Sequence, residues 1–377
     1  VDFDLMTRRP PMYPVILSVS LLVFDDIQLI LLLQLFLTFL NGFIIFRITG
    51  YYDLSSHWRL ILTIIFLLYP SQLIFTNILM SEVVLQSFLL SAFYFILKYN
   101  DTRKISYLLF YDLCLVAAVF TKPIMLYFWI PNLLIHVWFY FRDRKKTILI
   151  LPLIFILAVS CWSYRNYRQT GVFHYSSIKN HNLLRYNIRG FLTSKYDTEK
   201  AEQFITQINK EAVRKASYSE QYKFLENKIY DIIFSNVFAY SAFHLKGTIN
   251  FFIDPGRFDL YNFLQIESSV SLLKLYHQHG FKAIFYIFKE IPLTLLVYLS
   301  AMSVINILFL GAVIYFIITP NRNRFYKIFL LTVCLYVALL TGPIGASRFR
   351  LPIFPFLVLT LPLIIERLFG GQTTQYS

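Results

Sequence analysis

The sequence predicts an all-α polytopic membrane protein, and three observations support this fold class. Hydrophobic residues make up 57% of the 377 residues and charged residues only 15%, whereas about a quarter of an ordinary soluble domain is charged. Several apolar runs approach the roughly 20 residues that an α-helix needs to cross a bilayer. Most basic residues stand in short loops between these runs, which is the distribution of a multi-pass membrane protein.

The first part of the chain alternates apolar runs with short polar turns. It opens on a polar segment that ends at Arg8-Arg9-Pro10-Pro11, where the two prolines prevent a continuous helix. Residues 12–24 are apolar but short, which predicts an interfacial or half-buried helix ended by Asp25-Asp26. Full spans follow, with a bend expected near Tyr69-Pro70. These spans are predicted at residues 27–46, 60–75, 83–97, 107–120, 124–141 and 147–161.

The chain leaves the membrane at Cys161–Phe173. Residues 166–285 have the composition of a soluble protein and form a polar insert. Within it, apolar residues recur at helical spacing over 197–217 and over 219–240, which predicts two amphipathic helices. Asp254-Pro255-Gly256 predicts a turn.

Apolar spans return after the insert. The first covers 284–318 with Pro292 as its expected kink, and two more cover 328–340 and 351–368, which gives about nine spans altogether. The predicted organisation has three parts. They are a first transmembrane bundle over 1–165, an external polar domain over 166–285, and C-terminal transmembrane helices over 286–377.

The basic loops alternate along the chain so that all of them lie on one face of the membrane. These loops contain Arg47 and Arg59, Arg103 and Lys104, Arg142 to Lys146, and Arg322 and Arg324. By the positive-inside rule this face is the cytoplasmic one. The insert is then expected outside the cytoplasm, on the same face as Arg8–Pro11, Glu82, Lys122 and Ser347–Arg350.

Composition also bears on the classes of partner. The net charge of +14 would suggest a nucleic-acid partner in a soluble protein, but here the membrane loops account for it, so we expect lipid contacts and no nucleic acid. Cys114, Cys161 and Cys334 lie in or beside apolar runs and far apart, which indicates neither a disulfide framework nor a zinc site. The sequence contains no P-loop, no dinucleotide-binding glycine motif and no G-x-S-x-G motif.

Polar residues at the outer ends of the spans are the candidates for chemistry. Glu82 stands at a membrane boundary, where an ionisable group is costly and is usually paired or functional, although interfacial water could also satisfy it. Each basic residue nearby could simply extend to lipid head groups. Together they suit a phosphate at the membrane surface, because cations supply charge-assisted hydrogen bonds. These basic residues are Lys122, Arg165, Arg348 and Arg350.

With these residues placed, the chain resembles a known family. It resembles the bacterial polytopic glycosyltransferases of the GT-C fold, in the group related to dolichyl-phosphate-mannose protein mannosyltransferases and lipid A aminoarabinose transferase. The match extends over nearly the whole chain, in the family's order. The stretches that carry it are Arg9-Pro10-Pro11-Met12-Tyr13-Pro14 (R-P-P-L-Y-P in the family), Met80-Ser81-Glu82, Thr121-Lys122-Pro123 (T-R-P), Arg165-Asn166-Tyr167 with Gly171-Val172-Phe173, Ser176-Ser177 and Asn182-Leu183, and Ser347-Arg348-Phe349-Arg350-Leu351-Pro352.

The resemblance implies a GT-C-like helical bundle with an outer-face, mainly helical soluble insert, in the bacterial inner membrane. It implies an inverting transferase that moves a sugar from a polyprenyl-phosphate donor to a protein or glycolipid acceptor. A catalytic aspartate would act as general base, and Glu82 would orient the acceptor or a cation. Lys122, Arg165, Arg348 and Arg350 would stabilise the leaving lipid phosphate.

The catalytic aspartate of the family follows a first membrane helix, usually some way upstream of the R-P-P motif. Either Asp4 takes its place here, or the usual residue lies upstream of Val1 together with that helix. In the second case we expect a chain that begins at Val1 to be inactive. No cofactor is predicted, and the sequence leaves open whether a divalent cation takes part.

Two other function classes stay open. A transporter or flippase of a lipid-linked saccharide would also use outer cations, and polar residues deep in the spans would favour it; Gln34 and Asn41 are the main examples in the sequence. A non-catalytic membrane scaffold would use the external domain to bind partners. The scaffold hypothesis predicts no cavity between Glu82 and Arg348.

Overall fold

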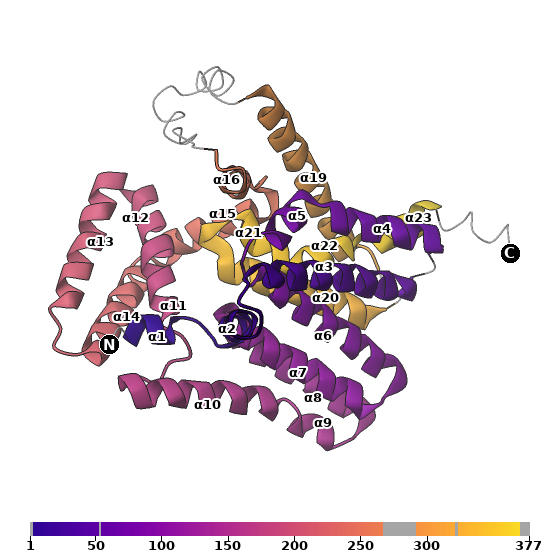
Figure 1. Cartoon of the computed structure of the whole chain (residues 1–377), viewed down its shortest axis with the longest axis horizontal. Helices are drawn as coiled ribbons and strands as arrows, with labels where there is room; N and C mark the ends of the chain where they lie inside the picture. Colours follow the sequence, from indigo (N-terminus) through magenta and orange to yellow (C-terminus); the bar gives the residue numbers. More distant parts are fainter. Residues whose placement is uncertain (1–2, 53, 267–291, 321–322, 370–377) are drawn as a thin grey trace.

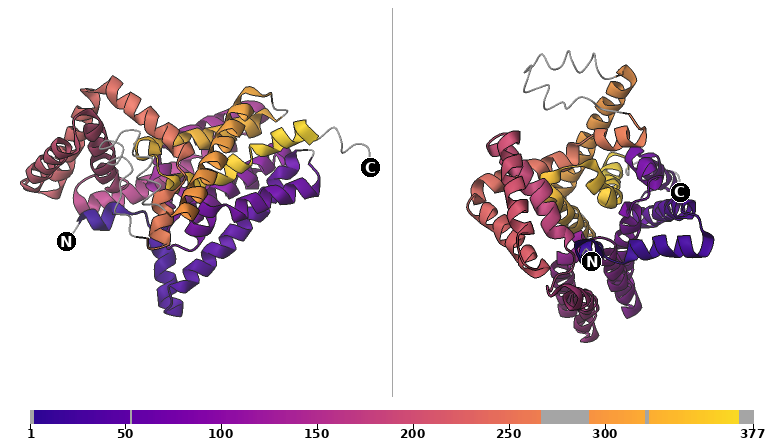
Figure 2. Two further views of the ribbon diagram at one scale, coloured as in Figure 1. Left: turned by 90° about the horizontal axis from the view of Figure 1, so that it is seen from above. Right: turned by 60° about the vertical axis from the view of Figure 1, so that its left-hand side comes forward.

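In the computed structural model, residues 3–52, 54–266, 292–320 and 323–369 are described, and they form helices without a strand. Figure 1 shows a bundle of long helices with a smaller helical group beside it, and Figure 2 shows these two parts from two further sides. The described part of the chain is therefore all-α, as the sequence predicts.

Helices in the first part of the chain alternate with short turns. They are α1 (Phe3–Arg8), α2 (Met12–Phe24), α3 (Gln28–Ile48), η1 (Thr49–Tyr51), α4 (Ser56–Leu68), α5 (Pro70–Thr76), α6 (Glu82–Thr102), α7 (Ile105–Thr121), η2 (Pro123–Phe128), α8 (Trp129–Asp143), α9 (Thr147–Ile150) and α10 (Leu153–Thr170).

The second part of the chain contains the smaller group and the last membrane helices. They are α11 (Ile178–Asn182), the π-helix η3 (Leu183–Ile188), α12 (Arg189–Lys195), α13 (Thr198–Val213), α14 (Tyr218–Phe234), α15 (Val237–Ile253), α16 (Arg257–Phe263), α19 (Leu293–Ile318), α20 (Arg324–Thr341), η5 (Gly342–Ile344), α21 (Ser347–Arg350), η6 (Leu351–Ile353), α22 (Phe354–Val358) and α23 (Leu361–Phe369).

The helices of the bundle have the length and composition of membrane spans. Seven described helices are long and apolar enough to cross a bilayer, or eight if α4 and α5, bent by 56° at Tyr69, form one span. The apolar helix α7, with 17 residues, occupies the place of a further predicted span. The chain is thus an all-α, multi-pass membrane protein, and the bend expected near Tyr69-Pro70 is confirmed.

Pro292 has a different role from the one predicted. It is the residue immediately before α19, which begins at Leu293, so it starts the helix and does not kink it. A proline lacks the N–H that a helix interior needs, whereas the first turn does not use that group, so this position suits it. The predicted span from 284 and the predicted domain boundary at 285 fall on residues outside the described ranges.

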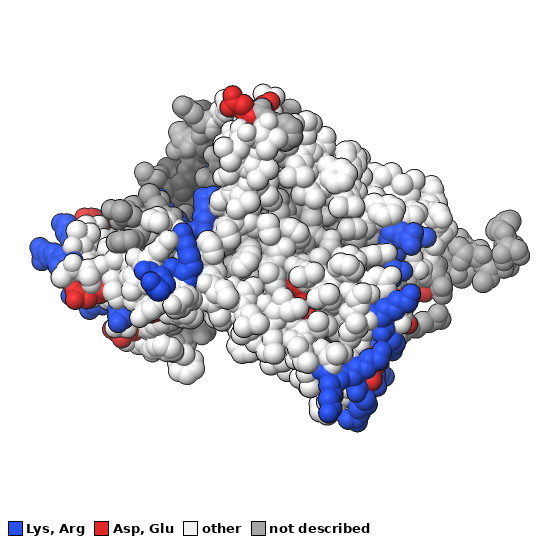
Figure 3. All heavy atoms as spheres, turned by 60° about the horizontal axis from the view of Figure 1, so that its bottom comes forward, with Lys and Arg blue, Asp and Glu red and all other residues white. Residues whose placement is uncertain are grey.

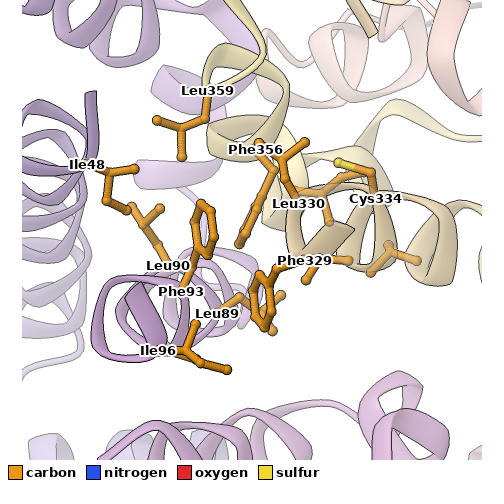
Figure 4. Close-up of a cluster of buried hydrophobic side chains, with 14 of the residues drawn as sticks. Ile48, Leu89, Leu90, Phe93, Ile96, Phe329, Leu330, Cys334, Phe356 and Leu359 are labelled. Carbon is orange, nitrogen blue, oxygen red and sulfur yellow. The ribbon is translucent and has the colours of Figure 1, made fainter. Parts of the chain in front are cut away.

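Aromatic rings from α6, α20 and α22 form the centre of the bundle, as Figure 4 shows. Phe93 of α6 stacks on Phe329 of α20 with ring centroids 4.9 Å apart, and it lies 5.6 Å from the ring of Phe356 in α22. Tyr326 contacts Phe93 at 5.1 Å. Each such ring pair contributes about 0.5–1.5 kcal/mol beyond burial, so these contacts fix how the last spans pack on α6.

The helices η3, α12, α13 and α14, with Tyr240 of α15, enclose a second, smaller hydrophobic core, and we call residues 178–234 the outer domain after the face on which the sequence predicts them. The two predicted amphipathic helices are confirmed as α13 and α14. Asp197 accepts from the backbone N–H of Lys200 at 2.7 Å, and Ser217 accepts from that of Glu220 at 3.3 Å, so both helices begin at a capping side chain. Their apolar stripes face each other through residues such as Ile208 and Ile229.

The boundary between bundle and outer domain lies elsewhere than predicted. The position between 165 and 166 falls inside α10, which continues to Thr170 and ends at Gly171 with φ +70°. The residue that ends the helix there has a left-handed backbone conformation, which glycine adopts without strain. Further on, α15 returns to the bundle, since Phe251 belongs to the bundle core.

The interior of the bundle holds more polar residues than Gln34 and Asn41, which corrects the expectation that such residues are sparse. Several of them pair with one another: Gln86 accepts from Asn41 at 3.0 Å and donates to Gln72 at 3.0 Å. Scattered along separate apolar runs, these residues meet only after folding. The other buried ones include Thr38, Thr76, Asp112, Asn132, His136 and Asn306.

Two of the basic loops meet at one end of the bundle. Lys145 donates to the carbonyl of Arg103 at 3.3 Å, and Asp143 pairs with Arg142 at 2.8 Å and Arg103 at 3.5 Å. Figure 3 shows basic side chains gathered at two ends of this view, with a wide uncharged band between them. We call the end of the bundle opposite to these loops the outer end; Glu82 and Thr121 lie there, because α6 and α7 both reach the basic loops with their other ends.

Candidate functional site

Glu82 is the centre of an ionic cluster at the outer end of the bundle. Its side chain is 0% exposed, and its Oε1 accepts from Lys122 Nζ at 2.8 Å and from Nε of Arg348. The second oxygen, Oε2, has no hydrogen-bond partner among the described residues. A buried carboxylate needs cationic partners to remain charged, so Lys122 and Arg348 stabilise the ionised form of Glu82.

Helix geometry brings Glu82 and Lys122 together. Glu82 is the first residue of α6, and Lys122 directly follows the last residue of α7. The two helices run antiparallel through a tight turn at Arg103, whose φ is +57°, so the start of one lies beside the end of the other. An acid at a helix N-terminus and a base at a C-terminus are each favoured by the helix dipole, and Pro123 prevents α7 from continuing.

Arg348 reaches the cluster from α21, and a separate contact fixes that short helix. The backbone N–H of Ser347 donates to Asp254 Oδ2 at 2.6 Å, and its hydroxyl donates to the Asp259 carboxylate. The turn predicted at Asp254-Pro255-Gly256 is present, with φ +79° at Gly256. A Cβ on Gly256 would lie 3.1 Å from the Ser347 hydroxyl, so glycine also provides room for this contact.

Around Glu82 itself, two cations face one carboxylate. Lys122 Nζ and the Arg348 guanidinium lie 5.8 Å and 5.9 Å from the ring centre of Phe349, and the charge of Arg9 also acts on Lys122. Burial raises the pKa of the Asp259 carboxyl, the Ser347 hydrogen bond partly offsets this, and nearby Asp254 raises the pKa further. Asp259 is therefore protonated more readily than an exposed aspartate.

Arg350, predicted as a phosphate ligand, is engaged elsewhere. It is almost fully buried and donates to the carbonyls of Phe251 at 3.0 Å, Phe252 at 2.6 Å and Asp254 at 2.9 Å, and to the Tyr69 hydroxyl at 3.1 Å. These carbonyls lie at the end of α15, where a helix leaves its last acceptors unpaired. Arg350 thus joins α15 to α21, and the structure does not bring it into the Glu82 cluster.

Arg165 and Asp4 lie on the N-terminal side of the site. Arg165 donates to the Asn166 side chain at 2.9 Å and to the carbonyl of Met6 at 3.4 Å, and it lies 4.8 Å over the ring of Trp162. It therefore holds α1 against α10, and none of these contacts involves Glu82. Asp4 belongs to α1, but its side chain is outside the described part of the structure.

Three residues join the site that were not predicted as members. Arg9 stood in the R-P-P motif on the outer face, and its charge was the available signal. Asp254 was visible only as part of a turn, and Asp259 gave no signal because an acid in the first turn of a helix is ordinary. Asp254 and Asp259 reach the site through Ser347, a contact between segments far apart in the chain.

Glu82 and Arg348 touch directly, so these two side chains enclose no cavity between them. Among the described residues, no group of three or more His, Cys, Asp or Glu side chains could hold a metal ion. No protein-family model, no curated protein and no solved structure matches this chain.

Proposed function

We propose that this protein is a membrane glycosyltransferase that moves a sugar from a polyprenyl-phosphate donor to an acceptor at the outer face. One observation carries the proposal: Lys122 and Arg348 converge on the buried carboxylate of Glu82 at the outer end of the spans. An ion cluster at this depth lies where a lipid-linked phosphate would present its head group. The motifs of the GT-C resemblance include all three residues.

The basic residues would stabilise the lipid phosphate as it leaves the sugar. Arg348 exposes 37% of its side chain and Lys122 exposes 16%, so a phosphate can reach both from the outer side while Glu82 lies beneath them. The leaving phosphate gains negative charge in the transition state, which cations already in place stabilise. Glu82 accepts from both cations, so a bound phosphate would compete with Glu82 for them. Without phosphate, the Glu82 carboxylate would reduce the repulsion between Lys122 and Arg348.

A cavity beside the N-terminal helices could serve as the route for the donor. It has a volume of about 470 Å³ and lies between the first half of α2 and Trp162 in the middle of α10, and its lining includes Arg8 and Arg9. Val15 of α2 is more than half exposed on the same wall, which is favourable where a helix faces lipid. A polyprenyl chain could lie along this apolar wall with its phosphate near Arg9, from which the charge acts on Lys122.

Replacing the cations tests the proposal. Protein in lipid nanodiscs would be supplied with polyprenyl-phosphate sugars, and release of polyprenyl phosphate in the presence of acceptor would be followed. We expect Lys122→Ala and Arg348→Ala each to lower turnover at saturating donor by about 100-fold, because each removes a charge that acts mainly in the transition state. Arg348→Lys, which keeps the charge but not the forked geometry, should retain part of the activity.

Arg168→Ala is the matched control, since Arg168 is exposed on α10 and donates a hydrogen bond to the Tyr164 hydroxyl at 3.5 Å, outside the Glu82 cluster. It should keep the parent turnover. Thermal unfolding of each variant separates lost chemistry from lost folding. Unchanged turnover of both alanine variants, with a donor that saturates, would exclude the phosphate role.

A further inference from the structure

The outer domain contains a cavity that the proposed transfer site does not use. It has a volume of about 770 Å³ and lies among α11, η3, α12, α13 and α14. One wall includes the π-helix η3, through Leu184 and Arg185. A π-helix is rare and costs stability, so it is frequently retained where it shapes a functional site.

A buried side chain at the cavity wall lacks a partner for one of its polar atoms. Asn180 is 4% exposed; its Nδ2 donates to the carbonyl of Tyr222 at 3.4 Å, and its Oδ1 accepts from no described residue. Leaving a buried amide oxygen unpaired costs about 1–3 kcal/mol. Asn180 lines the cavity, but this oxygen is itself almost fully covered, so a ligand hydroxyl donates to it once the Asn180 side chain turns toward the cavity.

The rest of the lining indicates the chemistry of such a ligand. Asn209, Gln221 and Ser217 offer neutral donors and acceptors, and Tyr218 and Tyr222 contribute ring edges or faces. This mixture of amides, hydroxyls and aromatic rings matches a ligand that has many hydroxyl groups and an apolar ring face, as a saccharide has.

The charges of the lining side chains indicate the charge of the ligand. The lining has three basic side chains, Arg185, Arg189 and Lys215, against one acidic side chain, Glu202, which is paired with Arg189. Arg185 has no hydrogen-bond or ion-pair partner among the described residues, and Lys215 lies 4.7 Å over the ring of Phe224. Two cations are thus left to meet an anionic group of the ligand.

We infer that this cavity binds an anionic saccharide, whose hydroxyl donates to Asn180 and whose acidic group meets Arg185 and Lys215. Its identification as the acceptor of the transferred sugar, or as a part of that acceptor, rests on the proposed function. The binding itself does not, because it depends only on the lining of the outer domain. The inference favours a glycan acceptor over a protein acceptor.

Calorimetric titration of the whole protein in nanodiscs tests the inference. The probes are tetragalacturonate, which is anionic, and maltotetraose, which is a neutral oligosaccharide of equal length. We expect tetragalacturonate to bind at least about tenfold more tightly, since a hydrogen bond to a charged group contributes about 1.5–3 kcal/mol. Arg185→Ala and Asn180→Ala should each weaken its binding by about tenfold.

Lys210→Ala is the matched control for charge, because Lys210 is exposed on α13 and does not line the cavity; it should bind tetragalacturonate as the parent does. Arg185 is exposed, so its replacement should fold, and thermal unfolding verifies Asn180→Ala. Failure of tetragalacturonate to bind, equal binding of both probes, or equal weakening by Lys210→Ala and Arg185→Ala would each overturn the inference.

The two proposals fail separately. Lys122→Ala should lower transfer by about 100-fold and leave tetragalacturonate binding intact. Binding by the parent protein, together with unchanged sugar transfer in Lys122→Ala and Arg348→Ala, would support the saccharide cavity and overturn the phosphate role on which the transferase proposal rests. Transfer that is lost in Lys122→Ala, by a protein that binds neither probe, would overturn the cavity and support the transferase.

Discussion

Asp112 and His136 form a second buried ionisable group, within the bundle and away from the Glu82 cluster. Both are 0% exposed, and His136 Nε2 lies 3.0 Å from Asp112 Oδ2. Asn132 donates to the other oxygen of Asp112 at 3.0 Å, and its backbone carbonyl lies 3.0 Å from His136 Nδ1. Like Glu82, Asp112 is thus tolerated because specific partners replace the water it has lost.

Removing Asp112 should destabilise the protein strongly. Asp112→Ala leaves His136 and Asn132 buried without their acceptor, which costs about 3–5 kcal/mol when one member of a buried pair is removed. Asp112→Asn, which retains an acceptor oxygen, should cost less. The midpoint of thermal unfolding in nanodiscs would measure both effects.

Leu113→Ala serves as the control, because Leu113 is the next residue of α7 and is 45% exposed on the outside of the bundle. Its midpoint should stay close to that of the parent. If Asp112→Ala were as stable as Leu113→Ala, the buried group would not hold α7 against α8.

Two buried glutamine side chains stabilise the ends of broken helices in the bundle. α5 ends at Thr76 within the bundle, and its last carbonyls lack helical N–H donors. Gln34 of α3 donates to the carbonyls of Thr76 at 3.0 Å and Ile78 at 2.8 Å, and Gln86 of α6 donates to Leu351, in the short helix η6, at 2.7 Å. In a bilayer no water can satisfy these groups, so neighbouring side chains do.

This arrangement also bears on the transporter alternative. Most polar side chains inside the bundle contact the ends of broken helices or one another, which gives them a structural purpose, whereas Asn41 Oδ1 and Asn132 Oδ1 have no partner among the described residues. They therefore do not by themselves favour a substrate pathway across the membrane.

Gln34→Leu should loosen the end of α5. The carbonyls of Thr76 and Ile78 would lose a donor, and the Tyr13 hydroxyl, which donates to Gln34 Oε1 at 3.1 Å, would lose its acceptor. An unpaired buried group costs about 1–3 kcal/mol, so we expect a destabilisation of at least that size. Unfolding by denaturing detergent would measure it, and faster hydrogen exchange over residues 73–80 would locate it.

Gln28→Leu makes the same chemical change at an exposed position at the start of α3. It should leave both stability and exchange unchanged. Equal behaviour of the two leucine variants would show that Gln34 does not support the helix end.

α15 connects the outer domain to the membrane bundle, and a close backbone contact fixes this connection. Gly247 of α15 lies against η5: a Cβ there would contact the carbonyl oxygen of Gly342 and lie 2.7 Å from Cα of Pro343. The same helix ends in the carbonyls that Arg350 holds, and the Asp254 turn that positions Ser347 follows it. The outer domain, the Glu82 cluster and the last spans are thus joined through one helix.

Gly247→Ala should therefore shift α15 away from the C-terminal spans. The obstructing atoms are backbone and cannot rotate aside, and overpacking of this kind costs about 1–3 kcal/mol. We expect a lower thermal midpoint together with weaker sugar transfer, because Ser347 and Arg348 would lose their anchor. Transfer assays and thermal unfolding of the same preparation would test both.

Gly311→Ala is the comparison, since Gly311 also lies within a helix, α19, and a Cβ there would meet nothing within 4 Å. It should be neutral or slightly stabilising, because alanine favours a helix more than glycine does. Parent-like behaviour of Gly247→Ala would mean that α15 is free to move on the bundle.

The sequence by itself determined the class of the protein and most of its helices. Apolar runs of membrane length, separated by basic loops, require helical spans, because only a helix pairs every backbone group within one apolar segment. The helix over 12–24, the bend at Tyr69 and the two capped helices of the outer domain follow from local signals such as Pro70, Asp197 and Ser217. Local chemistry suffices for these features.

Only the tertiary structure decided which side chains act together. Glu82, Lys122 and Arg348 were candidates, yet their contact depends on the antiparallel packing of α6 and α7 and on the anchoring of α21 by Asp254. Arg350 was an equal candidate and faces the end of α15, because two residues along a short helix point to different sides. Contacts between distant segments depend on how the helices pack, and that packing cannot be inferred from local signals in a single sequence.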